Sequence, residues 1–452
     1  MSETEPPARQ DTRRNRQQIL SAAASLLRSG EHLTAGGVAA RAGLARATVY
    51  RYFSSMDDLA AAAGPLTAEL EAAEPWPFDM HTALEHVPAH RLPAAIVTEA
   101  QRSTGGRPIG LYLVDIDGSR LARAAGDDEL PQTLTIPQAV GPELAGAQIE
   151  GVHDAITEQL PEAVVAPLVV RDRAIGVLVS LGTPDSGDFQ RFARDAAVAL
   201  EIGGRFTDEV QRARRHRETT SSAETQQLLL PARVSAMTDL LFAGHVQPGY
   251  ENGGNWFDHA ENEDGAWLAA IDTVGSDERG AAVSAVALGA LRAARNAGST
   301  PSDALQAMHD AIRRIGLADV TCSAWVARWH APSSLVFWAA GGTLIPNLLR
   351  TGTRRRVMSG AVGPELGADS FTQPVTNHLR LVPGDLVLLL SDGVSGTRNA
   401  ALDRAQVDAA LSDVALVPAD VVSAILGAVA AQPTDLQDDA MAVAFAPVPV
   451  DG

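Results

Sequence analysis

The sequence predicts an α/β protein built from several domains, and three observations support this fold class. A length of 452 residues favours about two to four domains, each with its own core. Near the N-terminus apolar residues recur at helical spacing, whereas further on short apolar runs end at turn residues, as strands do. In the second half three such runs border an aspartate, namely Asp272, Asp392 and Asp439. We expect four segments, comprising residues 1–74, 80–204, 205–227 and 228–452.

Composition excludes several classes of protein. The net charge of −19 argues against a chain that coats nucleic acid along its whole length. All 36 basic residues are arginine, which excludes P-loop NTPases, protein kinases and Schiff-base enzymes, because their motifs need a lysine. The single cysteine, Cys322, excludes an internal disulfide and a cysteine-rich zinc site. No apolar run reaches about 18 residues, so we expect a cytoplasmic protein with no membrane span.

The first segment carries a local excess of positive charge. Between residues 12 and 52, seven arginines stand against one acidic residue, Glu31, and such an island suggests contact with phosphate groups. Periodicity predicts helices over residues 13–29, over 34–42 with Thr34 as N-cap, and over about 45–52. A fourth helix is predicted to start at Ser55, which forms a capping-box-like pair with Asp58.

The stretch from Ile19 to Phe53, with Thr48-Val49-Tyr50-Arg51-Tyr52-Phe53 at its end, closely resembles the TetR-type helix-turn-helix. This resemblance and the basic island predict binding of duplex DNA, and we expect a homodimer because one module offers few phosphate contacts. The resemblance places three residues at the groove-facing start of the recognition helix: Arg46, Ala47 and Thr48. It places three others against backbone phosphates: Thr34, Tyr50 and Arg51. Ala45 and Met56 depart from the usual serine and lysine, and a helical module kept only for packing or dimer contacts is the alternative.

The segment 80–204 mixes strands with helices. Residues 110–116 predict a strand, and residues 164–170 and 175–181 predict a hairpin. The hairpin sequence resembles the signature of a GAF domain, and this implies an α+β sensor of an unidentified small ligand. No cysteine or histidine stands where a haem or bilin would attach, so we expect no cofactor in this segment.

A long helix is predicted from Asp188 onward, with apolar residues spaced alternately by three and four. The stripe consists of Phe189, Phe192, Ala196, Ala199, Gly203, Phe206 and Val210. Its first part suits a helix that packs on its own sheet, and its remainder suits a parallel two-stranded coiled coil in a helical connector, residues 205–227.

The three aspartates of the last segment predict a metal site. An ionised carboxylate beside a buried strand is unstable unless a cation or hydrogen-bond donors compensate it, and oxygen ligands suit Mg²⁺ or Mn²⁺ rather than zinc. Taken singly, Asp392-Gly393 could be an ordinary turn and Asp438-Asp439 could flank a strand. A glycine-rich aromatic segment, residues 253–258, precedes Asp272 by one hairpin's length, and this combination favours a functional site.

Residues 228–446 resemble the bacterial PPM-type serine/threonine phosphatase domain of the SpoIIE/RsbU class. The matching motifs occur in order: Gly253-Gly254-Asn255-Trp256-Phe257-Asp258, Ile271-Asp272-Thr273-Val274-Gly275, Ser391-Asp392-Gly393-Val394 and Asp438-Asp439. The resemblance implies an αββα sandwich with two divalent ions, Mn²⁺ or Mg²⁺, that activate a bridging water. It implies that Asp272 bridges both ions, that the carbonyl of Thr273 ligates one, and that Asp392 and Asp439 hold the other.

The implied reaction is hydrolysis of phosphoserine or phosphothreonine on a partner protein, which the resemblance suggests is an anti-sigma-factor antagonist. Asn255 stands where the family has a metal-binding aspartate, so we expect one ion to bind more weakly and activity to be reduced. The alternative is a TetR-like transcription regulator whose phosphatase-like domain is catalytically impaired.

Overall fold

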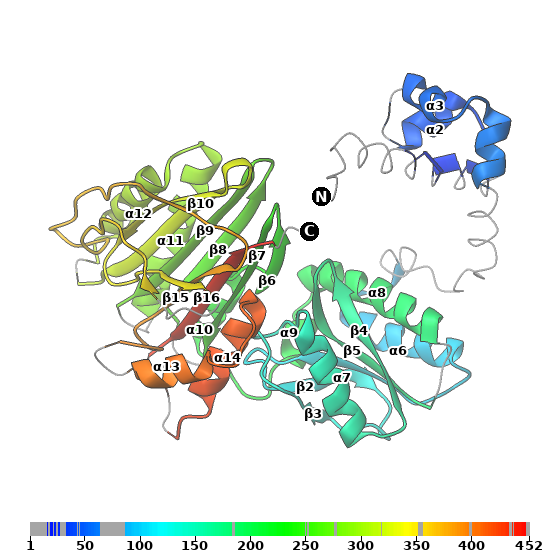
Figure 1. The fold of residues 1–452 in the computed structure, drawn as a ribbon. Helices are drawn as coiled ribbons and strands as arrows, with labels where there is room; N and C mark the ends of the chain where they lie inside the picture. The colour runs from blue at the N-terminus through cyan, green and yellow to red at the C-terminus, as the bar shows by residue number, and fades with distance from the viewer. Residues whose placement is uncertain are drawn as a thin grey trace. The chain divides into compact units, whose positions relative to one another are not determined.

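The computed structural model consists of two compact units, residues 1–77 and 78–452 (Figure 1). It describes residues 33–42, 44, 46–63, 86–182, 186–248, 250, 253–274, 278–317, 319–350, 356–396, 400–433, 436 and 438–448, together with single positions between 16 and 27. No helix in these ranges is both long and apolar enough to cross a membrane.

The first unit is helical. It contains α2 (Ala35–Ala42), α3 (Arg46–Tyr52) and a further helical stretch at residues 56–63. Thr34 caps α2 as predicted, since its Oγ1 accepts a hydrogen bond from Gly37 N at 3.1 Å. Ser55 Oγ accepts one from Asp58 N at 3.0 Å and begins the last helix. Apolar residues of the helices pack into one small core, which includes Ile19, Val38, Val49 and Leu59.

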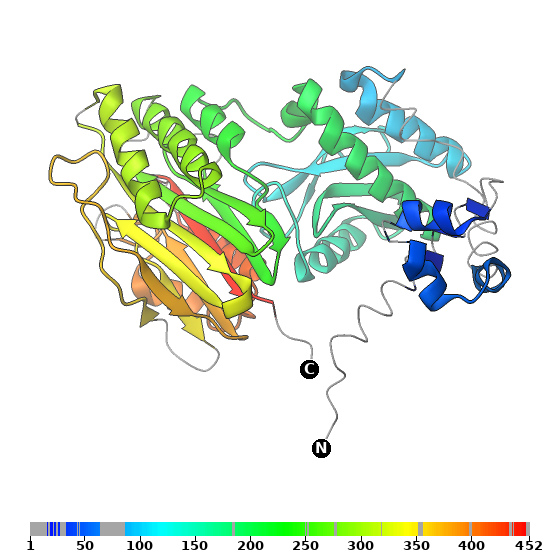
Figure 2. The same cartoon turned by 90° about the horizontal axis from the view of Figure 1, so that it is seen from above.

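The second unit begins with an antiparallel five-stranded sheet in the order β3-β2-β1-β5-β4. Its strands are β1 (Ile109–Val114), β2 (Arg120–Gly126), β3 (Thr133–Thr135), β4 (Ala163–Val170) and β5 (Arg173–Leu181). The helices are η1 (Ala89–Arg91), α6 (Leu92–Ser103), α7 (Ala147–Gln159) and α8 (Ser186–Gly203). Figure 2 shows α6 and α8 together on one face of the sheet and α7 on the other. The β4–β5 hairpin confirms the predicted pairing.

The predicted long helix with a continuous heptad stripe is wrong, because α8 ends at Gly203. A short 3₁₀ turn η2 (Gly204–Phe206) and then α9 (Glu209–Ala213) follow it. Two successive glycines disfavour helix at this point, and Gly203 lies so close to Leu92 of α6 that a Cβ would meet that side chain. The first part of the stripe is buried as expected for a helix that packs on its own sheet, whereas Phe206 is exposed.

The remainder of the second unit is a sandwich of two antiparallel sheets. The first has the order β14-β11-β10-β9-β8 and the second the order β13-β12-β15-β16-β7-β6. The strands of the first are β8 (Trp256–Asn262), β9 (Gly265–Thr273), β10 (Cys322–His330), β11 (Leu335–Gly341) and β14 (Asn377–Arg380). Those of the second are β6 (Val234–Met237), β7 (Leu240–Gln247), β12 (Asn347–Arg350), β13 (Arg356–Val357), β15 (Asp385–Leu390) and β16 (Ala440–Pro447).

Helices cover both outer faces of the sandwich, so that four layers result. Contacts with β9, β10 and β11 place α11 (Glu278–Asn296) and α12 (Pro301–Ile315) on the first sheet. Contacts with β7 and β16 place α14 (Pro418–Ala430) on the second, beside α13 (Arg404–Ala410). A short 3₁₀ turn, η3 (Ala331–Ser333), links β10 to β11. Because both faces of each sheet are covered, β9 and β16 are buried along their whole length.

Large aromatic side chains fill the space between the two sheets. Trp325 of β10 and Phe445 of β16 have ring centroids 5.7 Å apart, and Phe242 of β7 and Phe257 of β8 have centroids 5.6 Å apart. Cys322 is a free, buried thiol at the start of β10. The α/β multidomain fold class and the αββα sandwich predicted from the sequence are confirmed.

The sandwich contacts the first sheet of the unit directly. Glu143, which precedes α7, accepts hydrogen bonds through Oε2 from the backbone N of Arg233 at 2.8 Å and of Val234 at 2.9 Å. Gln148 Nε2 donates to the carbonyl of Ala419 at 3.1 Å. In the chain, α10 (Ser221–Leu229) lies between the first sheet with its helices and the sandwich, and it packs on α11.

Candidate functional site

Strand ends of both sheets bring acidic residues together at one edge of the sandwich. Asp272 lies at the end of β9, Asp392 in the turn after β15, and Asp438 just before β16. We call these three residues the carboxylate edge. Asp392 donates its backbone N–H to Asp272 Oδ2 at 3.2 Å, which ties the turn of one sheet to the strand of the other.

Burial and repulsion from neighbouring charges make the carboxyl groups of Asp272 and Asp438 reluctant to ionise. Burial raises the pKa of Asp272 to about 8, and the negative charges of Asp392 and Asp438 add to this effect. The pKa of Asp438 is also raised, mainly by burial and in part by the charge of Asp392. The charges at the carboxylate edge therefore favour a cation.

Asp439 is turned away from this edge. Its side chain is 1% exposed, and Oδ2 accepts hydrogen bonds from Gln226 Nε2 of α10 at 2.8 Å and from Asn255 N at 3.2 Å. Burial raises its pKa to about 7. The sequence analysis named Asp439 of the Asp438-Asp439 pair as a metal ligand, an assignment that stays a prediction, and it did not single out Gln226. The two-residue period of a strand, by which neighbouring side chains point to opposite sides, is the signal that separates Asp438 from Asp439.

Asn255 uses both ends of its amide to join strands. Its Oδ1 accepts from the backbone N of Thr273 at 2.9 Å, and its Nδ2 donates to the carbonyl of Asp439 at 3.2 Å. An aspartate at this position could accept from Thr273 but could not donate to a carbonyl oxygen. Asn255 is therefore matched to its surroundings, because it fixes the end of β9 against the start of β16.

Further contacts hold the same strand ends. Thr273 Oγ1 lies 2.8 Å from Ser284 Oγ of α11, and Ser284 in turn donates to the carbonyl of Gly254. Ser391 Oγ donates to the carbonyl of Asp439 at 2.8 Å. Gly393 packs so tightly that a Cβ would collide with that same carbonyl oxygen, which explains why glycine follows Asp392.

The donor set at the carboxylate edge fits a hard divalent cation. Its ligand atoms are oxygens, and their negative charges lie within range of one another in a partly buried place. Outside the carboxylate edge, the neighbouring Asp439 Oδ1 is also buried without a hydrogen-bond partner in the described structure. No group of three or more His, Cys, Asp or Glu side chains among the described residues forms a ready-made metal site.

The residues predicted to contact DNA lie on α2 and α3 of the first unit. Arg46, Tyr50 and Arg51 are exposed on α3, with 49% of Tyr50 accessible, and the Arg51 guanidinium lies 5.2 Å from the ring centroid of Tyr52. Thr48 is half-buried and Thr34 is exposed at the N-cap of α2. The side chain of Ala47 lies outside the described residues. Arg46 and Tyr50 are four residues apart and share one face of α3.

Comparison with known families agrees with this division of the chain. Residues 262–446 match the family described as Stage II sporulation protein E (SpoIIE). Residues 19–63 match the family described as bacterial regulatory proteins, tetR family. A search of curated proteins found no match.

Three solved structures show the range of similarity. The SiaA-PP2C domain of Pseudomonas aeruginosa is 19% identical, with 50% of this chain and 92% of that chain covered and a TM-score of 0.41. The RsbU and RsbW domains of a Mycobacterium tuberculosis protein are 21% identical, with 49% and 64% covered and a TM-score of 0.40. The PPM Ser-Thr phosphatase MsPP from Mycobacterium smegmatis is 20% identical, with 48% and 100% covered and a TM-score of 0.34.

These matches confirm the two resemblances at the ends of the chain, whereas the GAF resemblance of the segment 80–204 stays a prediction. The chain therefore has an N-terminal region that matches the tetR family of bacterial regulatory proteins and a C-terminal region that matches the SpoIIE family.

Proposed function

We propose that the sandwich is a metal-dependent protein serine/threonine phosphatase that uses two divalent ions, Mn²⁺ or Mg²⁺. The observation that carries this proposal is the carboxylate edge, where Asp272, Asp392 and Asp438 lie close enough to repel one another. The SpoIIE family match over residues 262–446 supports the assignment. Bound divalent ions would supply a water of lowered pKa and neutralise the charge of the phosphoryl group.

The chain's own residues have distinct roles in this proposal. Asp272, Asp392 and Asp438 would hold the metal ions through carboxylate oxygens, and the carbonyl of Thr273 would add a neutral ligand. Asp439, Gln226 and Asn255 are positioning residues, since their hydrogen bonds hold the turn before β16 in place. Asn255 contributes no charge, so an ion held beside it would gain less electrostatic stabilisation than it would beside an aspartate.

The substrate we propose is a phosphoserine or phosphothreonine on a partner protein, with an anti-sigma-factor antagonist as the first candidate because the sandwich resembles the SpoIIE/RsbU class. The alternative function is a transcription regulator whose sandwich has lost catalysis and serves only for binding. The two functions differ in whether the wild-type protein turns over a phosphate ester.

The test is hydrolysis of p-nitrophenyl phosphate by the full-length protein as a function of Mn²⁺ concentration. We expect Mn²⁺-stimulated turnover, with a loss in kcat/KM of at least about 10³-fold in Asp272→Ala, because the carboxylate that binds the ions is removed. Asp392→Ala and Asp438→Ala should act similarly. Asp413→Ala, which removes an exposed carboxylate, is the matched control and should retain full activity. Equal activity in wild type and Asp272→Ala would rule out the metal assignment, and an inactive wild type would favour the regulator.

For the first unit we propose binding of duplex DNA as a homodimer. The tetR family match over residues 19–63 and the exposed Arg46, Tyr50 and Arg51 support this proposal. One such unit offers few phosphate contacts, so two half-sites about one helical turn apart should be needed. Arg46→Ala should reduce sequence preference, whereas Arg51→Ala should weaken all sequences alike and lower the salt slope by about one unit.

Selection from random duplexes, followed by salt titration of the selected sites, tests DNA binding. Arg191→Ala is a suitable control, since it removes an exposed arginine of α8 that belongs to the second unit. No enrichment of any sequence, together with no duplex binding at low salt, would reduce the first unit to a packing or dimerisation module.

A further inference from the structure

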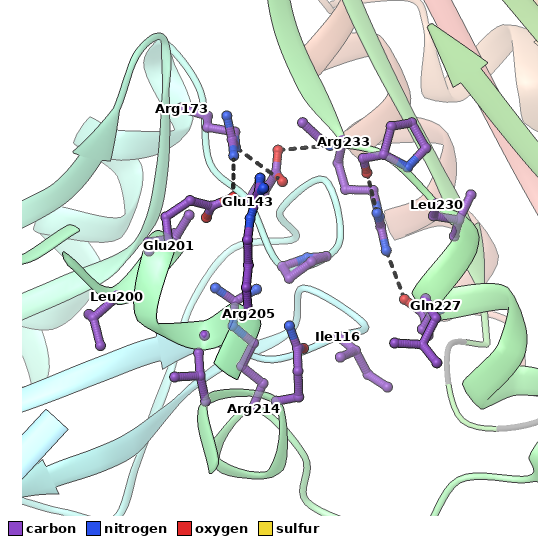
Figure 3. A pocket seen from close by; sticks show the side chains of 18 of the residues that line it. Ile116, Glu143, Arg173, Leu200, Glu201, Arg205, Arg214, Gln227, Leu230 and Arg233 are labelled. Carbon is purple, nitrogen blue, oxygen red and sulfur yellow. Dashed lines mark hydrogen bonds and ion pairs between the residues drawn. The ribbon is translucent and has the colours of Figure 1, made fainter. Parts of the chain in front are cut away.

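A polar cavity lies between the first sheet of the second unit and the sandwich. Its volume is about 220 Å³, and its lining comes from β5, the end of α8, α9 and the residues after it, α10, and the segment before β6. Figure 3 shows charged side chains from both parts directed into this space, among them Glu143, Arg173, Arg214 and Arg233. None of these residues takes part in the phosphatase site proposed above.

The cavity is positively charged in a chain of net charge −19. Five arginines line it: Arg173, Arg205, Arg214, Arg215 and Arg233. Only three acidic residues oppose them: Glu143, Glu201 and Glu224. We call this space the arginine cavity. Its excess of two positive charges lies partly out of water, where uncompensated charge is unfavourable.

Each of the three glutamates already contacts a particular arginine. Glu143 lies 3.2 Å from Arg173 Nε and also accepts hydrogen bonds from the backbone N–H groups of Arg233 and Val234. Glu201 Oε1 lies 3.2 Å from Arg173 Nη2. The third, Glu224, accepts a hydrogen bond from Arg215.

Arg214 and Arg233 are the two buried arginines of the cavity that no glutamate side chain pairs with in the described structure. Arg214 is 7% exposed, and its buried Nε has no hydrogen-bond partner among the described residues. Burial lowers the pKa of its guanidinium, although the charges of Glu143 and Glu201 oppose this effect. The buried Nε atoms of Arg215 and Arg233 are also without partners in the described structure. The unpartnered N–H donors of these three arginines therefore border the same cavity.

We propose that the arginine cavity binds a small oxyanion, a carboxylate or phosphoryl group, with the Arg214 guanidinium as its main contact. A guanidinium presents paired N–H donors that match the oxygens of either group. The volume is below the range of about 300–1,000 Å³ that suits drug-sized ligands, so the ligand, or its anionic part, is small. Binding would add a bridge between the first sheet and the sandwich, because Arg173 and Arg233 belong to different parts.

The cavity and the carboxylate edge share one helix. Gln227 of α10 accepts a hydrogen bond from Arg233 at 2.8 Å in the cavity, and the preceding residue, Gln226, donates to Asp439. An anion bound in the cavity therefore contacts the same helix that positions Asp439. The binding proposal itself does not depend on phosphatase activity.

The test measures thermal unfolding and calorimetric binding of the full-length protein in EDTA, at constant ionic strength, with inorganic phosphate in one series and malonate in the other. EDTA excludes phosphate bound through metal ions at the carboxylate edge. We expect a saturable rise in Tm for the wild type with at least one anion. Arg214→Gln should bind that anion at least about tenfold more weakly, since it loses charge-assisted hydrogen bonds. A preference for phosphate or for malonate identifies the chemical group.

Two further variants of exposed residues complete the experiment, one as a second test and one as a control. Arg205→Glu reverses a charge at the cavity without burying anything new and should abolish the Tm rise, even if Arg214→Gln folds poorly. Arg212→Glu changes an exposed arginine of α9 that does not line the cavity, and it should keep the wild-type response. No saturable rise in the wild type with either anion, or equal rises in wild type, Arg214→Gln and Arg205→Glu, would overturn the proposal.

Discussion

The carboxylate edge and the arginine cavity both place uncompensated charge in partly buried parts of the second unit, but the charges have opposite sign. At the carboxylate edge, Asp272 is repelled by the charges of Asp392 and Asp438, and no arginine is among the main causes of its raised pKa. In the arginine cavity, arginines outnumber glutamates and Arg214 has no hydrogen-bonded carboxylate in the described structure. Each region is therefore incomplete by itself, and the sign of the missing charge indicates what it binds.

A third group, Asp258, is a buried carboxylate whose charge the chain itself compensates. Its buried carboxylate in β8 accepts hydrogen bonds from Arg292 Nη2 and from Arg295 Nη1, both at 2.9 Å. Both arginines extend from α11, on the outer face of the same sheet. A structural carboxylate is thus compensated by the chain itself, whereas the carboxylate edge is not. This difference argues that Asp272 is present for binding rather than for stability.

The largest effect that we expect from this comparison is on stability in the absence of metal. Asp258→Asn should destabilise the sandwich by about 2 kcal/mol, because two charge-assisted hydrogen bonds are weakened and two arginines lose their counter-charge. Asp272→Asn should leave stability unchanged or raise it, because it removes a repelled charge. Urea unfolding in EDTA, followed by tryptophan fluorescence, measures both, since five of the six tryptophans lie in the sandwich. An Asp272→Asn variant less stable than Asp258→Asn would contradict this distinction.

A smaller effect should separate two neighbouring residues of α10. Gln226→Met removes the hydrogen bond to Asp439 and should raise the Mn²⁺ concentration for half-maximal turnover about tenfold, as loss of a group that orients ligands does. Gln227→Met should leave that Mn²⁺ requirement unchanged and weaken anion binding in the arginine cavity instead. Metal titrations and anion titrations on both variants measure this. Identical changes in the two variants would show that α10 responds as a whole.

The smallest effect concerns Asn255→Asp. Without metal, the new carboxylate faces the carbonyl of Asp439 at the position where Asn255 donates, so stability should fall by about 1 kcal/mol. With Mn²⁺, the added charge should tighten metal binding, because a negative group next to divalent cations is attractive at any effective dielectric constant. Unfolding in EDTA and in Mn²⁺ measures both parts. Unchanged or weaker Mn²⁺ binding would show that Asn255 is adapted to its hydrogen bonds and is not a degraded ligand.

The sequence predicted the elements that depend on local patterns. Buried strands that end at Asp272 and Asp392 were recognisable as apolar runs followed by turn residues, and Thr34 was recognisable as a helix cap. The same patterns predicted the β4–β5 hairpin. Local periodicity failed at Gly203, where the apolar spacing continued but two glycines and the contact with Leu92 ended the helix.

The sequence by itself determined the strands, the caps and the order of the acidic residues, because these depend on neighbours along the chain. Only the tertiary structure decided which of Asp438 and Asp439 joins Asp272, since this depends on the direction in which a strand enters the sheet. It also decided that the Asn255 amide joins two strands, and that Arg173, Arg214 and Arg233 border one cavity. Such arrangements bring together residues far apart in sequence, and their energies depend on burial and on distance, which exist only after the chain has folded.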